Sequence, residues 1–292
     1  MKKMISGFIG LAFTLFSCTS RDTIVDKTNM NGYDFKLFQG TQSWTLAKAV
    51  EDEDTGKIVS IVTKNKELLE SREPKFGQTL LKMAVRTLKF KSVKTLINQG
   101  ADPNIQDTYD GSSPFMEAAR IDWIGPDKYG GDIRYLRLLL VHGGDPNAEE
   151  KGKRRKGNNT RYTPLLRACS SASGNLAYVK LLVEAGANVN YNNEYNMNPL
   201  GSAVFFAENP DIVLYLIEKG ADIRRPVLKN IRGKDFLITD ALRTWRFPLG
   251  SDEYKKKMQI VDYLKKNGMD YWKAPIPENY LDQYPKDYLE KY

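Results

Sequence analysis

The sequence predicts an all-α repeat protein, a solenoid of about six helix-turn-helix units. One supporting observation is a helix-stop signal, a glycine two residues before Asp or Asn, which recurs at Gly100, Gly143, Gly186, Gly220 and Gly268. Glycine tolerates the left-handed backbone that closes a helix. The other is an apolar face seven, four and three residues before each of the first four glycines, as in Val179, Leu182 and Val183. This spacing is typical of an amphipathic helix.

Signals for the start of a helix lie upstream of these stops. A capping side chain precedes a helical segment at Thr79, Ser113, Thr163 and Asn198, and proline follows the last three. Such a side chain satisfies the first free N–H groups of a helix, and proline suits the first helical position. A small residue then recurs at Ala84, Ala118, Ala168 and Ala203. It allows neighbouring first helices to pack closely.

The interval between start signals is 34 residues from Thr79 to Ser113 and 35 from Thr163 to Asn198. With these motifs the chain resembles the ankyrin repeat family, whose period is about 33 residues and whose unit is a β-turn plus two helices. The resemblance implies an ankyrin-repeat solenoid over residues 43–270, with short β-turn fingers and two degenerate capping units, the first and the sixth. The family's histidine is replaced in four units, by Lys82, Met116, Leu166 and Gly201.

The amino terminus has the features of an export signal. Lys2 and Lys3 precede an apolar run that ends at Phe16 and is too short to span a bilayer. The run closes on Ser17-Cys18, which resembles the cleavage box of bacterial lipoproteins, whose cysteine becomes acylated. We therefore expect a lipoprotein signal peptide over residues 1–17 and lipid attachment, such as palmitate, at Cys18. An ordinary signal peptide is the alternative. Thr19 in place of an aspartate favours the outer membrane.

The segments that flank the repeats differ from them in composition. Residues 18–42 are polar and lack periodicity, so we expect a flexible tether between the lipid and the first unit. Residues 271–292 form an aromatic C-terminal tail with tyrosines at intervals of four, Tyr280, Tyr284, Tyr288 and Tyr292. We expect this tail to pack on the last repeat and cover its apolar side. Docking of a partner on the tail is the alternative.

The charge of the chain is modestly basic. The formal net charge is +8, and removal of Lys2 and Lys3 with residues 1–17 lowers it to +6. The loop 151–156 contains five basic residues, but it has no interleaved aromatics and belongs to no recognisable nucleic-acid fold. We interpret it as a solvated loop tip, with anionic lipid or an acidic partner as alternatives. No nucleic acid is expected.

Catalytic chemistry has few candidates in this sequence. The single histidine, His142, has no Cys or His neighbours at metal-ligand spacing. No nucleophile elbow, phosphate-binding glycine loop or HExxH motif occurs. We therefore expect no enzyme activity, no cofactor and no metal. A secreted hydrolase on a helical scaffold is the alternative class.

The residues expected to bind a partner follow from the register of the repeats. The resemblance to ankyrin repeats implies that finger tips and exposed ends of first helices face the concave side, and here they carry residue types common in binding hot spots. These candidates are Arg86, Tyr109, Arg120, Tyr162, Tyr195, Met197, Phe205 and Phe206. The sequence thus predicts a membrane-anchored envelope lipoprotein that binds a protein partner, either as a scaffold or as an immunity protein that neutralises a toxin.

Overall fold

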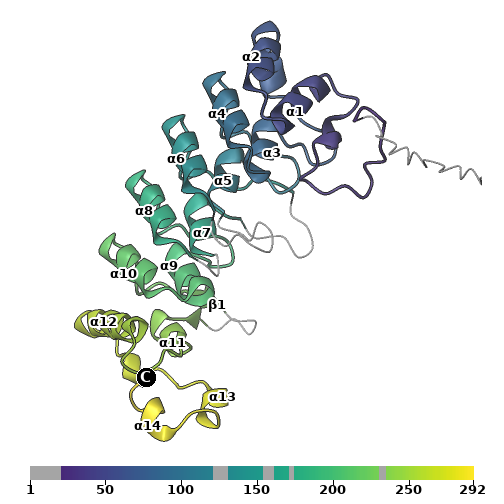
Figure 1. Cartoon of the computed structure of the whole chain (residues 1–292). Helices are drawn as coiled ribbons and strands as arrows, with labels where there is room; N and C mark the ends of the chain where they lie inside the picture. Colours follow the sequence, from purple (N-terminus) through teal and green to yellow (C-terminus); the bar gives the residue numbers. More distant parts are fainter. Residues whose placement is uncertain (1–20, 121–130, 154–160, 171–173, 230–234) are drawn as a thin grey trace, which may run out of the picture.

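The computed structural model describes residues 21–120, 131–153, 161–170, 174–229 and 235–292. Within these residues, six antiparallel helix pairs stack into two rows, which confirms the predicted all-α solenoid (Figure 1). The inner row consists of α1 (Trp44–Glu51), α3 (Leu80–Arg86), α5 (Pro114–Ala118), α7 (Pro164–Cys169), α9 (Pro199–Ser202) and α11 (Ile238–Leu242). The outer row consists of α2 (Thr55–Lys64), α4 (Phe90–Asn98), α6 (Ile133–Val141), α8 (Leu176–Glu184), α10 (Pro210–Glu218) and α12 (Asp252–Lys266).

The predicted helix signals operate as expected. Side chains of the four predicted caps each accept the backbone N–H group of the residue three positions later, at 2.7–3.3 Å. The five predicted stop glycines have positive φ values between 80° and 99°. Such values strain any residue with a Cβ, so glycine is the residue that fits these helix ends.

One apolar core runs through the whole array. Each unit contributes fully buried leucine, isoleucine or valine from its outer helix, such as Leu96, Leu136 and Leu182. These side chains pack against the inner helix of the same unit and against the next unit, and a single contact cluster extends from Phe35 to Tyr271. Stability is therefore distributed over units and the interfaces between them.

The segment before the first unit corrects the expectation of a flexible tether over residues 18–42. From residue 21 onward it is folded, and its 3₁₀-helix η1 (Phe35–Phe38) buries three of its four side chains. Phe35, Leu37 and Phe38 join the core beside α1, because the first unit has no preceding repeat to cover it. The expected signal peptide 1–17 and Cys18 lie outside the described residues. A second 3₁₀-helix, η2 (Lys66–Leu69), follows α2.

The aromatic tail folds back onto the sixth unit. It contains η4 (Tyr271–Lys273), α13 (Glu278–Leu281) and α14 (Lys286–Leu289), which lie at the end of the array opposite α1 (Figure 1). The hydroxyl of Tyr292 donates to the carbonyl oxygen of Arg243 at 2.6 Å, and that of Tyr271 donates to the carbonyl oxygen of Tyr292 at 2.7 Å. The tail therefore covers the exposed end of the last repeat.

Candidate protein-binding face

The fingers, which are the connections leading into each inner helix, are shaped by buried polar side chains. In the finger before α5, Oδ1 of Asp107 accepts the N–H groups of Tyr109, Asp110 and Gly111, each at 2.9 Å. Asn193 accepts two N–H groups in the same way before α9, at 2.9 Å. Glu73 and Glu150 take this position in two other fingers. Each acceptor fixes the finger from inside.

Aromatic rings occupy the tips of these fixed fingers. Tyr109 and Tyr195, which each lie two residues after the acceptor, are 41% and 44% exposed. The ring of Tyr109 packs edge-to-face on Phe76 of the preceding finger, with 5.2 Å between centroids. Tyr162 is half-buried, with the Arg167 guanidinium 4.2 Å from its ring centroid. Met197 is half-buried as well. The structure thus exposes Tyr109 and Tyr195 more than the other two predicted finger residues.

The inner helix of the fifth unit widens into a π-helical segment, Ala203–Ala207. Single π-helical turns are frequent at functional sites, because the extra residue redirects side chains. Phe206 is 48% exposed. Phe205 instead packs on Phe236 of the following finger, at 6.4 Å between centroids. That finger carries a short antiparallel pair, β1 (Leu228–Lys229) with β2 (Asp235–Phe236), on the inner-row side.

The two arginines predicted to bind a partner form ion pairs within the molecule. Arg86 donates to both oxygens of Glu117, at 3.2 and 3.0 Å, and Arg120 lies 3.7 Å from the same carboxylate. Burial opposes ionisation of Glu117, but the charges of the two arginines outweigh it and lower its pKa. Tyr33 from the N-terminal segment stacks on the Arg86 guanidinium at 5.1 Å. Arg86 therefore links α3 to α5, whereas Arg120 pairs within its own unit; the sequence analysis missed both contacts.

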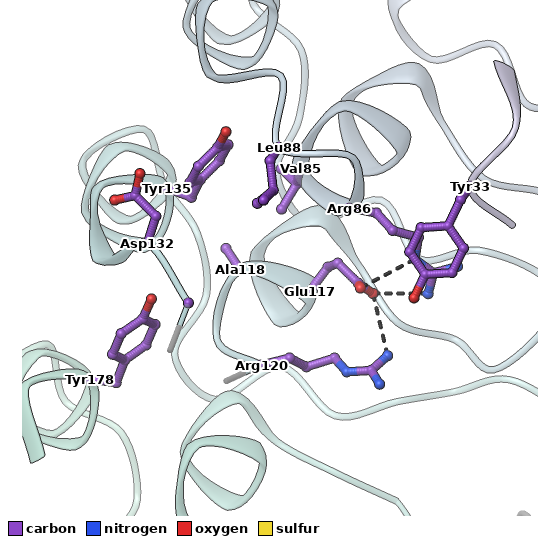
Figure 2. A pocket seen from close by; sticks show the side chains of 11 residues that line it. Tyr33, Val85, Arg86, Leu88, Glu117, Ala118, Arg120, Asp132, Tyr135 and Tyr178 are labelled. Carbon is purple, nitrogen blue, oxygen red and sulfur yellow. Dashed lines mark hydrogen bonds and ion pairs between the residues drawn. The ribbon is translucent and has the colours of Figure 1, made fainter. Parts of the chain in front are cut away.

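A small recess adjoins this charge cluster, and Figure 2 shows both of its walls. The cluster of Arg86, Glu117 and Arg120 forms one wall, and Tyr135 with Tyr178 forms the other. The free volume is about 40 Å³. This can hold a few water molecules or the tip of a partner side chain, and typical small-molecule pockets are larger, at about 300–1,000 Å³.

The hydroxyl of Tyr178 is a polar group in the wall of the recess. It is buried and has no hydrogen-bond partner among the described residues. An unpaired buried hydroxyl costs about 1–3 kcal/mol. Gly131 lines the recess beside it, and a Cβ there would approach the Tyr178 oxygen to 2.7 Å. The lack of a side chain at Gly131 therefore keeps this recess open.

Lys82 makes a buried polar contact between the second and third units. Its ammonium is fully buried and donates to Asp107 at 2.5 Å and to the Ser112 carbonyl oxygen at 3.0 Å. Burial raises the pKa of Asp110, but the Lys82 charge 3.6 Å away offsets this and helps to lower that pKa to about 2. Lys82 thus forms a buried polar network with the finger of the next unit.

Comparison with known proteins agrees with this geometry. A family model described as "Ankyrin repeats (3 copies)" matches residues 127–226, and another, "Ankyrin repeat", matches residues 76–108. Residues 76–108 and 127–226 therefore consist of ankyrin repeats. An ankyrin repeat domain from Acinetobacter baumannii AYE superposes with a TM-score of 0.55 at 24% identity, covering 76% of this chain and 97% of that domain. No curated protein matches the sequence.

Ankyrin repeats indicate a scaffold for protein–protein interaction, and the fold is typically non-catalytic. In the part of the chain that the structure describes, no cluster of His, Cys, Asp or Glu could hold a metal ion. Nor does any described helix combine the length and apolar character needed to cross a membrane. Of the basic loop, Lys151 and Lys153 are described and exposed, and residues 154–156 lie outside the described ranges.

Sequence reasoning overlooked the residues that build this face from within. These are the finger acceptors and the inner-helix carboxylate, Glu73, Asp107, Glu117, Glu150 and Asn193. A signal for three of them was present, because Glu73 and Asp107 stand six residues before a cap and Asn193 stands five residues before one. No comparable spacing marked Glu117, which looks like any helical surface acid in the sequence.

Proposed function

We propose that this protein is a lipid-anchored lipoprotein of the bacterial cell envelope that binds a protein partner through its finger tips and inner helices. It acts by binding and not by catalysis. A scaffold for an envelope complex and an immunity protein that occludes a toxin are the two forms this function can take. Thr19, which stands in place of an aspartate, favours the outer membrane as the location of the anchor.

The exposure of three aromatic rings supports this proposal most directly. Tyr109 lies in the finger of the third unit, Tyr195 and Phe206 lie in the finger and inner helix of the fifth, and between 41% and 48% of each is exposed. Burying a large apolar side chain completely is worth about 1.5–3 kcal/mol, so three half-exposed rings leave much binding free energy unused. The finger acceptors hold two of the rings in place before binding, which reduces the entropy lost on association.

A triple alanine variant of Tyr109, Tyr195 and Phe206 tests the binding face. We expect an unchanged helical circular dichroism spectrum and melting temperature, together with loss of the partner recovered by crosslinking in envelope membranes. A matched control replaces Tyr263 and Leu281, which are 41% and 55% exposed but lie elsewhere. Full partner recovery by the folded triple variant would contradict the proposal.

Anchoring is tested separately. Cys18→Ser is expected to abolish incorporation of radiolabelled palmitate, and Cys169→Ser, which changes a fully buried thiol, should retain it. Equal labelling of the wild type and of Cys18→Ser would contradict lipid attachment at Cys18.

The scaffold and immunity roles are distinguished by another observation. A neighbouring toxin gene, and protection by this protein when the two are co-expressed, would favour the immunity role over the scaffold.

A further inference from the structure

The beginning of the described chain is fixed to the first unit by charge. Arg21 donates from one guanidinium nitrogen to both oxygens of Asp52 at 2.8 Å, and from another to Glu51. The carboxylate of Asp22 accepts the indole N–H of Trp44 at 2.6 Å and pairs with Lys48 at 2.7 Å. Two consecutive residues are thus tied to α1 and to the turn that follows it.

Further bonds continue along the N-terminal segment 21–42. The Gln39 amide donates to the carbonyl oxygens of Arg21 and Thr23 at 3.2 and 2.9 Å. The ammonium of Lys75, from the finger before α3, donates to the carbonyl oxygens of Lys27, Thr28 and Met30 at 2.7–2.8 Å. A segment held at so many points has lost the freedom on which a flexible tether depends.

This rigidity limits the distance between the proposed lipid and the folded protein. The inference rests on the proposed attachment at Cys18. Three residue steps separate Cys18 from Arg21, and an extended chain advances at most about 3.6 Å per residue, or about 11 Å in all. A flexible tether of about 24 residues would instead reach about 25–30 Å. The first unit must therefore lie close to the lipid headgroups.

The surface beside Arg21 has side chains suited to contact with a membrane. Ile24 is 89% exposed, more than any other large hydrophobic residue of the described chain. It borders an open recess of about 250 Å³ together with Gly40 and the half-buried Trp44. The Lys48 ammonium lies 5.2 Å from the Trp44 ring. An exposed aliphatic side chain beside an indole and a lysine is typical of surfaces at a membrane interface.

The geometry points to a membrane-contact patch formed by Ile24 and Trp44, which rests the first unit on the bilayer once Cys18 is acylated. The remaining units then lead away from this end, with the aromatic tail farthest along the array (Figure 1). The binding face is consequently presented at a defined place relative to the membrane and does not swing on a flexible linker.

A fluorescent probe at Ile24 tests this contact. Ile24→Cys provides an accessible thiol for the dye NBD, because Cys169 is fully buried and Cys18 is acylated. The lipidated full chain is reconstituted in phosphatidylcholine–phosphatidylglycerol vesicles that contain a headgroup spin label. We expect the NBD emission at position 24 to shift to the blue and to be quenched at least twofold. The matched control, Leu281→Cys in α13, should show neither change.

Two further outcomes separate the possible failures. If the chain does not bind vesicles and carries no lipid, the proposed anchoring fails. If it binds but the probe at position 24 remains in water and unquenched, anchoring stands and the contact patch is wrong. Insertion of ten Gly/Ser residues between positions 20 and 21 should release the contact and reduce quenching. Unchanged quenching after this insertion would also overturn the claim that the short spacing positions the first unit.

Discussion

Asn147, in the finger before α7, is hydrogen-bonded to Asn188, which lies two positions after the glycine that ends α8. Its side-chain oxygen accepts the Asn188 N–H at 2.8 Å, and its side-chain nitrogen donates to the Gly186 carbonyl oxygen at 2.9 Å. Asn104 and Asn190 make the same pair of bonds one unit before and one unit after. Each of these asparagines therefore satisfies backbone groups at the open end of the next outer helix along the chain.

Replacement of Asn147 by alanine should weaken the coupling between units. Two hydrogen bonds disappear, and each is worth about 1 kcal/mol, so we expect a loss of about 1–2 kcal/mol in the free energy of unfolding measured by urea denaturation. The control Asn192→Ala removes an amide that donates to the side-chain oxygen of Asn196 within the same finger at 3.1 Å. Its expected effect is below about 0.5 kcal/mol. Equal losses in the two variants would contradict a coupling role for Asn147.

The core prediction concerns Leu182, which is fully buried in α8. Leu182→Ala should lower the free energy of unfolding by about 2–5 kcal/mol, because a buried side chain is lost and a cavity remains. Leu281→Ala, at a residue 55% exposed, is the matched control. A chemical denaturation curve for Leu182→Ala that overlays the wild type would place Leu182 outside the core.

The repeats were predictable because their signals recur. Caps, stop glycines and apolar faces such as Val179–Leu182 appear in several units at one period, and each occurrence supports the others. The N-terminal segment 21–42 offered no such repetition. Phe35, Leu37 and Phe38 show no period over four residues, and one important partner, Lys75, is more than 40 residues away. Only the folded structure brings these groups together.

The sequence predicted the exposure of three aromatic residues on the candidate face, but it did not predict the ion pairs of the arginines there. Repeat register correctly places Tyr109, Tyr195 and Phe206 in exposed positions. The same register also selected Arg86, because nothing local shows that Glu117, 31 residues later, neutralises it. An ion pair between two units forms only when the units stack. A single sequence contains both residues but does not show that they are in contact.

The buried ion pair of Lys82 with Asp107 should respond strongly to loss of the cation. Lys82→Met leaves the carboxylate buried without its counter-charge, and breaking a buried pair in this way costs about 3–5 kcal/mol. The double variant Lys82→Met/Asp107→Asn should recover most of this loss, because an asparagine oxygen can still accept the three finger N–H groups. Urea denaturation of the wild type, both single variants and the double variant measures the coupling. Additive effects would show that the pair is not coupled.

The last repeat contains a lysine that is buried without an acidic partner among the described contacts. The ammonium of Lys257 lies 4.4 Å from the ring centroid of Tyr292 and 5.3 Å from that of Tyr271, and it donates to the Trp245 carbonyl oxygen at 3.1 Å. Burial, with a smaller contribution from the charge of Arg243, lowers the pKa of Lys257 to about 7. Its aromatic neighbours offset only part of the cost of removing this cation from water.

The stability of the protein should therefore rise with pH in a window set by Lys257. Between the folded pKa of about 7 and the ordinary value of 10.5, the unfolded chain holds a proton that the folded chain has released. Stability then increases by at most about 1.4 kcal/mol per pH unit, and below pH 7 the full penalty remains. Lys257→Met should be more stable than the wild type at pH 6 and should lose this pH dependence. Lys266→Met, at an exposed site on the same helix, should keep it. Urea denaturation from pH 6 to 9.5 distinguishes these outcomes, and parallel curves for the wild type and Lys257→Met would mean that Lys257 keeps an ordinary pKa in the folded protein.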